Sequence, residues 1–221
     1  MIPHLIDGLG WKTIIALNNL EDVPATYTLT FIGEDGTPQT YATNFGNVST
    51  ITGSLAAHGS VTIETAGVKA ELTQGWANLD TVDTAAVGGT VVFRRVAGGQ
   101  PNYEASEPID GGLYKRYAMP FDHMDGSSTG IAIVNPITFG SATIQFIFRD
   151  ESGVQLFVDT FMLPAMNHVA ITFTQRYPQL AGKRGSFEVS ASTLWINVLA
   201  VHTFPTGSFT TIVPLVSGKW F

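Results

Sequence analysis

The chain has 221 residues, no cysteine, 44% hydrophobic residues, 13% charged residues and a formal net charge of −7. The apolar content is enough for one large or two small domains with real cores, whereas the absence of cysteine excludes disulfides, thiol chemistry and Cys-ligated metal sites. The acidic balance gives no general electrostatic field for holding nucleic acid, so we expect no nucleic-acid partner.

Short segments of strand-like sequence follow one another along the whole chain. Tyr27, Leu29 and Phe31 alternate with threonines, and the run from Ile144 to Phe148 repeats this period of two. Turn residues close both runs, at 34–36 and 150–153. Further strands are predicted at residues 11–17, 61–65, 90–96, 169–173, 195–201 and 209–213. No segment keeps a helical period for three turns, so the sequence predicts an all-β fold.

The two halves of the chain repeat each other. Residues 14–18 align with 131–135, and residues 25–36 align with 142–153, at a constant offset of 117 residues. Residues 55–63 then align with 163–171 at an offset of 108, so the first half carries nine additional residues between Thr37 and Ser54. The repeat predicts two tandem immunoglobulin-like antiparallel β-sandwich domains, at 1–112 and 113–221, that arose from an internal duplication.

Prolines mark the predicted sheet edges. Pro3 and Pro120 lie in the first strand of each half, and Pro108 and Pro214 lie in the last. Proline cannot donate a hydrogen bond to a neighbouring strand and is therefore confined to edges, strand starts and bulges. We expect the first and last strands of both halves to be edge strands.

The sequence gives little reason to expect an enzyme. Residues 126–130 satisfy the G-x-S-x-G spacing around Ser128, but they lead into a strand, whereas a hydrolase nucleophile needs a strand-to-helix turn. The five histidines lack zinc-ligand spacing, although His123 lies between two aspartates. We predict no catalytic residue, no metal and no cofactor.

Two features leave a glycan partner open. Aromatic rings at Trp11, Trp76, Tyr103, Tyr114, Tyr117 and Trp195 could form a sugar-stacking platform or belong to cores and contacts between the domains. Asn47 begins an N-x-S acceptor within the nine-residue insertion, where an exposed hairpin tip is expected, and is a candidate glycosylation site.

The sparse charge and the apolar ends favour self-assembly. A surface with so few charges is poorly protected against association. The opening segment contains Ile2, Pro3 and Leu5, and the segment from Ser217 ends in Trp220 and Phe221. Leu113 and Tyr114 hold the corresponding position between the halves, where we expect them to dock on the second domain. If Trp220 and Phe221 dock in the same way on the next molecule, the contact is head-to-tail and builds a filament.

Several motifs carry a resemblance to a known group of proteins. They are the Pro-x-x-x-Asp-Gly opening at 3–8, its longer equivalent at 120–126, the strands that end in Asn18 and Asn135, and the Ala-Thr-x-x-Phe hairpins that follow. These motifs resemble tandem β-sandwich repeats of bacterial cell-surface and secreted proteins of uncharacterised function, which include candidate subunits of pilus-like fibrils. The resemblance implies an extracellular structural module and no catalytic residue.

The resulting hypothesis is a structural protomer of an extracellular, non-covalent, pilus-like filament that assembles head-to-tail with itself through its terminal strands. No apolar run approaches the roughly 18 residues of a membrane span, and residues 1–4 lack the features of a signal peptide, so we expect the mature form of a secreted protein without a membrane span. The alternative is a carbohydrate-binding or adhesive surface module that does not self-assemble.

Overall fold

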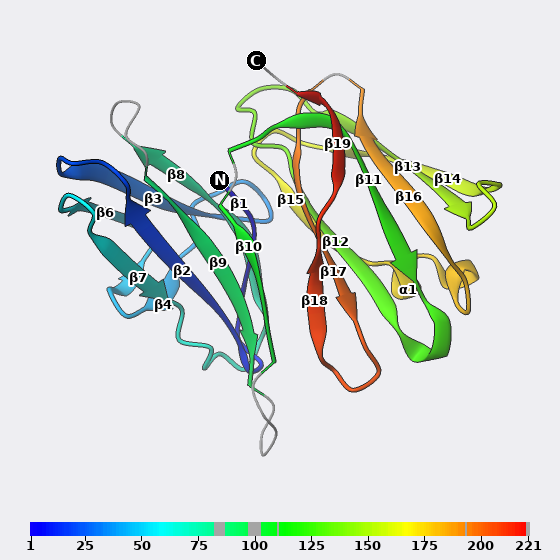
Figure 1. The fold of residues 1–221 in the computed structure, drawn as a ribbon, viewed down its shortest axis with the longest axis horizontal. Coiled ribbons are helices and arrows are strands. Elements are labelled where there is room, and N and C mark those ends of the chain that lie inside the picture. The colour runs from blue at the N-terminus through cyan, green and yellow to red at the C-terminus, as the bar shows by residue number, and fades with distance from the viewer. Residues whose placement is uncertain (82–86, 97–102, 110, 193, 220–221) are drawn as a thin grey trace. The chain divides into compact units, whose positions relative to one another are not determined.

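The computed structural model describes residues 1–81, 87–96, 103–109, 111–192 and 194–219 (Figure 1). Contacts divide the chain into two compact units, Met1–Gly111 and Gly112–Phe221, called unit 1 and unit 2 below. The regular structure in both units is almost entirely antiparallel strand. The predicted all-β fold class is therefore confirmed.

The described part of unit 1 contains two four-stranded sheets and a small hairpin. The sheet orders are β1-β8-β3-β6 and β10-β9-β2-β7, and β4 pairs with β5. The strands are β1 (Ile2–Asp7), β2 (Trp11–Asn19), β3 (Ala25–Gly33), β4 (Tyr41–Thr43), β5 (Gly46–Val48), β6 (Thr50–Leu55), β7 (Ser60–Glu64), β8 (Thr73–Thr81), β9 (Val87–Arg95) and β10 (Tyr103–Pro108).

The described part of unit 2 contains a five-stranded and a four-stranded sheet, with orders β14-β13-β16-β11-β19 and β15-β12-β17-β18. Short helical turns lie at η1 (Met124–Gly126), α1 (Phe173–Arg176) and η2 (Pro178–Leu180). The strands are β11 (Tyr114–Asp122), β12 (Ser128–Val134), β13 (Ala142–Asp150), β14 (Gln155–Leu163), β15 (His168–Thr172), β16 (Arg184–Ala191), β17 (Asn197–Thr203), β18 (Phe209–Ile212) and β19 (Leu215–Lys219).

Apart from β19, both units have the same sheet orders. The order β1-β8-β3-β6 corresponds to β11-β16-β13-β14, and β10-β9-β2-β7 corresponds to β18-β17-β12-β15. The β4–β5 hairpin lies between β3 and β6, in the region where the sequence predicts additional residues, whereas β13 and β14 are joined by a turn at residues 151–154.

The strand register changes one part of the sequence alignment. Ile15 pairs with Ile63 in unit 1, and Ile131 pairs with Ile171 in unit 2. Ile15 therefore corresponds to Ile131 at an offset of 116 residues rather than 117. The alignment of Asn18 with Asn135 is wrong by one residue, because the loop that follows β12 is one residue longer than the loop that follows β2.

Asn19 is the structural equivalent of Asn135, and both side chains are buried at the end of their strands. The Asn19 amide donates to the carbonyl oxygens of Val23 and Ala56, at 2.8 and 2.9 Å, and its Oδ1 accepts the Glu21 N–H at 3.0 Å. This amide therefore fixes the loop after β2 against the turn that precedes β7.

Asn135 makes the corresponding bonds in unit 2. Its amide donates to the carbonyls of Gly140 and Pro164 at 3.4 and 3.0 Å, which correspond to Val23 and Ala56, and also to that of Leu163 at 3.1 Å. Its Oδ1 accepts the Ile137 N–H at 3.2 Å. Because buried carbonyls must find donors, the two asparagines satisfy backbone groups that the sheets leave unpaired.

A buried threonine joins the two sheets in each unit. Thr13 of β2 donates through Oγ1 to the Ile6 carbonyl at 2.9 Å and accepts the Ile6 N–H at 3.0 Å. In unit 2, Thr129 of β12 accepts the Asp122 N–H at 3.2 Å. The first strand of each unit thus has part of its outer edge closed by a side chain from the opposite sheet.

Glycines permit a close strand approach at equivalent positions. A Cβ on Gly75 would lie 2.2 Å from the Ile32 carbonyl oxygen, and a Cβ on Gly185 would lie 2.0 Å from that of Arg149. Any side chain at either position would force neighbouring strands apart, so each position requires glycine.

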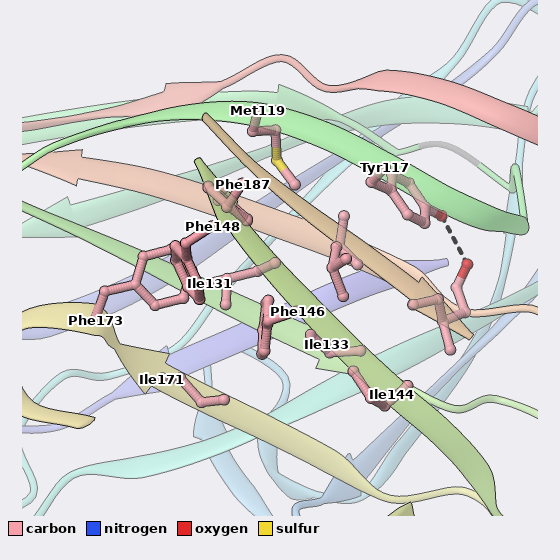
Figure 2. Packing of buried hydrophobic residues seen from close by; sticks show 14 of the residues in the cluster. Tyr117, Met119, Ile131, Ile133, Ile144, Phe146, Phe148, Ile171, Phe173 and Phe187 are labelled. Carbon is pink, nitrogen blue, oxygen red and sulfur yellow. Dashed lines mark hydrogen bonds between the residues drawn. The ribbon is translucent and has the colours of Figure 1, made fainter. Parts of the chain in front are cut away.

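The core of unit 2 is rich in aromatic rings and lies between its two sheets (Figure 2). Phe146 and Phe148 project from β13 and Phe187 from β16, while Ile131 and Ile133 come from the opposing sheet. Phe173 of α1 packs edge-on against Phe187 with ring centroids 4.7 Å apart. The inward positions are those of the predicted period-two pattern, which makes the unit sandwich-like.

The prediction about edge strands is correct for three of the four strands. β1 and β10, which contain Pro3 and Pro108, are edge strands, and so is β18. β11 is not an edge strand, because β19 covers it on the side away from β16. Pro120 is compatible with this arrangement because the pairing with β19 covers only residues 114–118.

Replacement of Asn19 by alanine should lower the free energy of unfolding by about 1–3 kcal/mol, because the buried Asn19 amide no longer donates to the carbonyls of Val23 and Ala56. Asn18, which is exposed on the same strand, is the matched control, and Asn18→Ala should change stability by less than about 0.5 kcal/mol. Urea unfolding of both variants measures the difference. Equal effects would contradict the register described above.

The stability of unit 1 should fall on acidification. Burial lowers the pKa of His4 to about 4 from an ordinary value of 6.5, and its ring packs 5.9 Å from that of Phe93. Below pH 6.5 the unfolded chain binds a proton that the folded chain refuses, so stability is complete above this pH and is lost by up to about 3 kcal/mol toward pH 4. In unit 2, burial likewise lowers the pKa of His123, so the stability of that unit should change with pH in the same direction.

The His4→Phe variant isolates this contribution. Urea midpoints measured between pH 7.5 and 4.5 should decline less for the variant than for the unchanged chain. Parallel profiles would show that His4 is not the responsible group.

Candidate assembly surface

The strand pair β11–β19 in unit 2 has no counterpart among the described residues of unit 1. Four residues of β11 have Cα partners in β19: Tyr114 with Lys219, Arg116 with Ser217, Tyr117 with Val216 and Ala118 with Leu215. The sequence predicts that the segment from Ser217 docks on another molecule, but Ser217 lies within a strand of its own unit. Pro214 followed by the β-prone Leu215 and Val216 was the available sequence signal, since proline often precedes a strand.

The beginning of β11 is held firmly to the rest of unit 2. Tyr114 exchanges two backbone hydrogen bonds with Ile196, both 3.1 Å long, and the Tyr117 hydroxyl donates to the Ile196 carbonyl at 2.7 Å (Figure 2). The Asn197 amide donates to the Gly112 carbonyl at 2.8 Å. β11 is therefore a fixed template for whatever strand pairs with its outer edge.

The strand on that template is itself poorly buried. Val213 and Leu215 are 88% and 78% exposed, and Val216 remains 43% exposed although it pairs with buried Tyr117. Few apolar contacts support the backbone pairing of β19, so this strand has less burial to hold it than the strands of the core.

Leu215 also begins a row of side chains across one face of the five-stranded sheet. Its Cα partner is Ala118, which is followed across the sheet by Glu188, Ile147 and Val158. Val158 is 43% exposed, and the one charged member, Glu188, forms an ion pair with Arg116 at 3.4 Å. This row, called the Leu215 row below, is largely uncharged.

The predicted opening segment lies in the core rather than on the surface. Ile2 and Leu5 are completely buried in β1, and Pro3 is buried as well. Their side chains therefore contribute to packing, and any contact of β1 with another molecule has to use its backbone edge.

The remaining predicted interface residues divide into two pairs. Leu113 and Tyr114 are half-buried at the start of unit 2, where the Tyr114 ring packs edge-on against Tyr117 with centroids 5.6 Å apart. Trp220 and Phe221 lie outside the described residues.

Asn47 is exposed in β5, directly after the turn of the β4–β5 hairpin. Its Cα partner across the hairpin is Ala42. Its exposure leaves the amide accessible to a glycosylating enzyme, as the acceptor hypothesis requires.

The aromatic residues considered for sugar binding do not form an exposed row. Trp76 and Tyr117 are buried, whereas Trp11, Tyr103, Tyr114 and Trp195 are half-buried. Two of the rings are covered by cations, since Arg95 lies 5.6 Å from the centroid of Trp11 and Lys115 lies 4.9 Å from that of Trp195. Two of the six side chains therefore belong to the interior, and the other four remain partly accessible.

The groups considered for chemistry are engaged in internal contacts. The Ser128 hydroxyl shares a hydrogen bond of 2.8 Å with Thr174, and His123 is buried against the rings of Phe121 and Phe173. Within the part of the chain that the structure describes, no group of three or more His, Asp or Glu side chains is placed to hold a metal ion.

A separate polar cluster in unit 2 joins β14 to the end of α1. Asp159 of β14 accepts from the Tyr177 hydroxyl at 2.6 Å and from Arg176 at 3.1 Å, and Arg176 stacks 5.0 Å from the centroid of Phe161. The Tyr177 hydrogen bond is the main cause that lowers the pKa of Asp159. Because this cluster fastens the segment after α1 to β14, its role is structural.

No helix in the described ranges is long and apolar enough to cross a bilayer. Comparison of the chain with protein-family models, with curated proteins and with solved structures found no match.

Hydrogen exchange should separate β19 from the strands beneath it. We expect the amides of residues 215–219 to exchange at least about tenfold faster than those of β16, because local opening of β19 exposes little additional apolar surface. Exchange followed by mass spectrometry of peptides from both strands measures this ratio. Equal protection would mean that β19 opens only together with the whole unit.

Proposed function

We propose that this protein is a structural protomer of an extracellular filament, built from two immunoglobulin-like sandwich modules that arose by duplication. The observation that carries the proposal is the exposed strand β19, whose one charged residue is Lys219 at its end, with the largely uncharged Leu215 row beside it. An apolar edge of this kind favours association with another chain. Proteins that remain monomeric usually protect their edge strands with several charges or prolines.

The duplication is supported by equivalent residues with equivalent bonds. Asn19 and Asn135 fix equivalent loops in the two units. Thr13 and Thr129 each bind the first strand of their own unit from the opposite sheet.

A structural role also agrees with how the reactive side chains are used. Ser128, His123 and Asp159 each take part in packing or in hydrogen bonds that hold unit 2 together. The low charge of the surface, with 13% charged residues over the whole chain, favours a protein that works next to copies of itself. The motif resemblance to bacterial surface repeats supports an extracellular location.

Electron microscopy and sedimentation of the purified chain test the proposal. We expect regular filaments for the unchanged protein and dispersed particles for the Leu215→Lys variant, because a charge in the Leu215 row must be desolvated when two copies meet. Val68→Lys is the matched control, since Val68 is 81% exposed in unit 1 and lies outside the row.

The control variant should form filaments like those of the unchanged chain. Dispersed particles for the unchanged protein at every concentration and salt condition would reject the filament role. Filaments that survive Leu215→Lys would place the contact on another surface.

A further inference from the structure

The first strands of both units have parts of their outer edge that offer no donor to an incoming strand, since in unit 2 the Asp122 N–H is bonded to Thr129 and Pro120 has no N–H. In β1, the outward N–H and C=O of Ile6 are already bonded to Thr13, and Pro3 has no N–H. Ile6 and Pro3 therefore provide no donor for a further strand. β11 also has residues 114–118, which lie on the N-terminal side of Pro120 and are paired in register with β19.

The outer edge of β11 at residues 114–118 can therefore accept an incoming strand, and the strand that fits this edge is β19. The fit includes Val216, which faces Tyr117, and Leu215, which continues the uncharged row beyond Ala118. Any copy of this chain carries both halves of the pair, the acceptor and the matching strand.

The link that holds β19 in place is short. β18 ends at Ile212 in one sheet and β19 begins at Leu215 in the other, so only Val213 and Pro214 carry the chain across. Val213 is 88% exposed and makes little contact with the unit. A change at these two residues would direct β19 away from its own β11 without disturbing the core. Short hinges of this kind permit an identical element to be exchanged between copies.

We propose that β19 is exchanged, so that β19 of one copy pairs with β11 of a second copy in the register seen within the chain. The exchanged and unexchanged forms have the same strand contacts and differ chiefly in the hinge, so protein concentration shifts the balance between them. A copy that gives β19 to one neighbour receives it from another, which yields an open-ended series. This inference rests on the proposed filament function and specifies the contact through which the copies meet.

Cysteine cross-linking tests the exchange directly, because the chain contains no cysteine of its own. Arg116 and Ser217 are exposed Cα partners across the pair, and partners in an antiparallel pair lie within reach of a disulfide. Arg116→Cys and Ser217→Cys are made in separate chains, mixed in denaturant, refolded together, concentrated and oxidised. A third chain carries both substitutions.

Exchange predicts covalent dimers that join one Arg116→Cys chain to one Ser217→Cys chain, and a ladder of multimers from the double variant. Gln145 and Thr160 are the control pair, because they are exposed partners in β13 and β14. Separate Gln145→Cys and Thr160→Cys chains should give no specific mixed dimer, whereas a single chain with both substitutions should cross-link internally.

The outcomes separate this inference from the filament role. Filaments whose double variant cross-links only within single chains would overturn the exchange and leave the filament role standing. Mixed dimers without filaments would support the exchange and overturn the filament role. Monomers without intermolecular cross-links at any concentration would overturn both.

Discussion

The buried asparagine at the end of the second strand is the interaction on which each unit depends. Asn19 and Asn135 lie where a strand leaves its sheet and turns into a loop, and each amide bonds to carbonyls on two separate segments. An apolar side chain at this position would leave buried carbonyls without donors, a cost that hydrophobic packing nearby cannot offset. The polar bond therefore sets where the loops begin, and the register of the surrounding strands follows from it.

The same need to satisfy backbone groups governs the sheet edges. Thr13 and Thr129 bond to the first strand of their units from the opposite sheet, and prolines remove donors where no partner is present. On the N-terminal side of Pro120, residues 114–118 of β11 are bound by neither threonine nor proline, and β19 pairs with this run. β19 thus pairs with the backbone groups of β11 that would otherwise lie open at the sheet edge. Because β19 is weakly buried, it is the part of the sheet best suited to the proposed pairing with another chain.

Packing and surface chemistry point in the same direction. The core of unit 2 is built from interlocking rings such as Phe148, Phe173 and Phe187 (Figure 2), which fix the sheets closely against each other. Outside this rigid interior, the Leu215 row contains one charged residue, Glu188, already paired with Arg116. A rigid module with a largely uncharged edge suits the proposed role of a building block, because repeated contacts require surfaces that keep their shape.

The sequence by itself determined the all-β class, the inward positions of strands such as β3 and β13, the additional hairpin region and the edge positions of β1 and β10. These follow from local rules: alternation with period two, turn residues and the missing donor of proline. Only the tertiary structure decided that Asn19 rather than Asn18 matches Asn135, that Ile2 and Leu5 face the core, and that residues 215–219 pair with β11. These three features depend on pairing between strands that are distant in the sequence. A loop that is longer by one residue shifts the register of the paired strands but leaves the local period-two pattern unchanged.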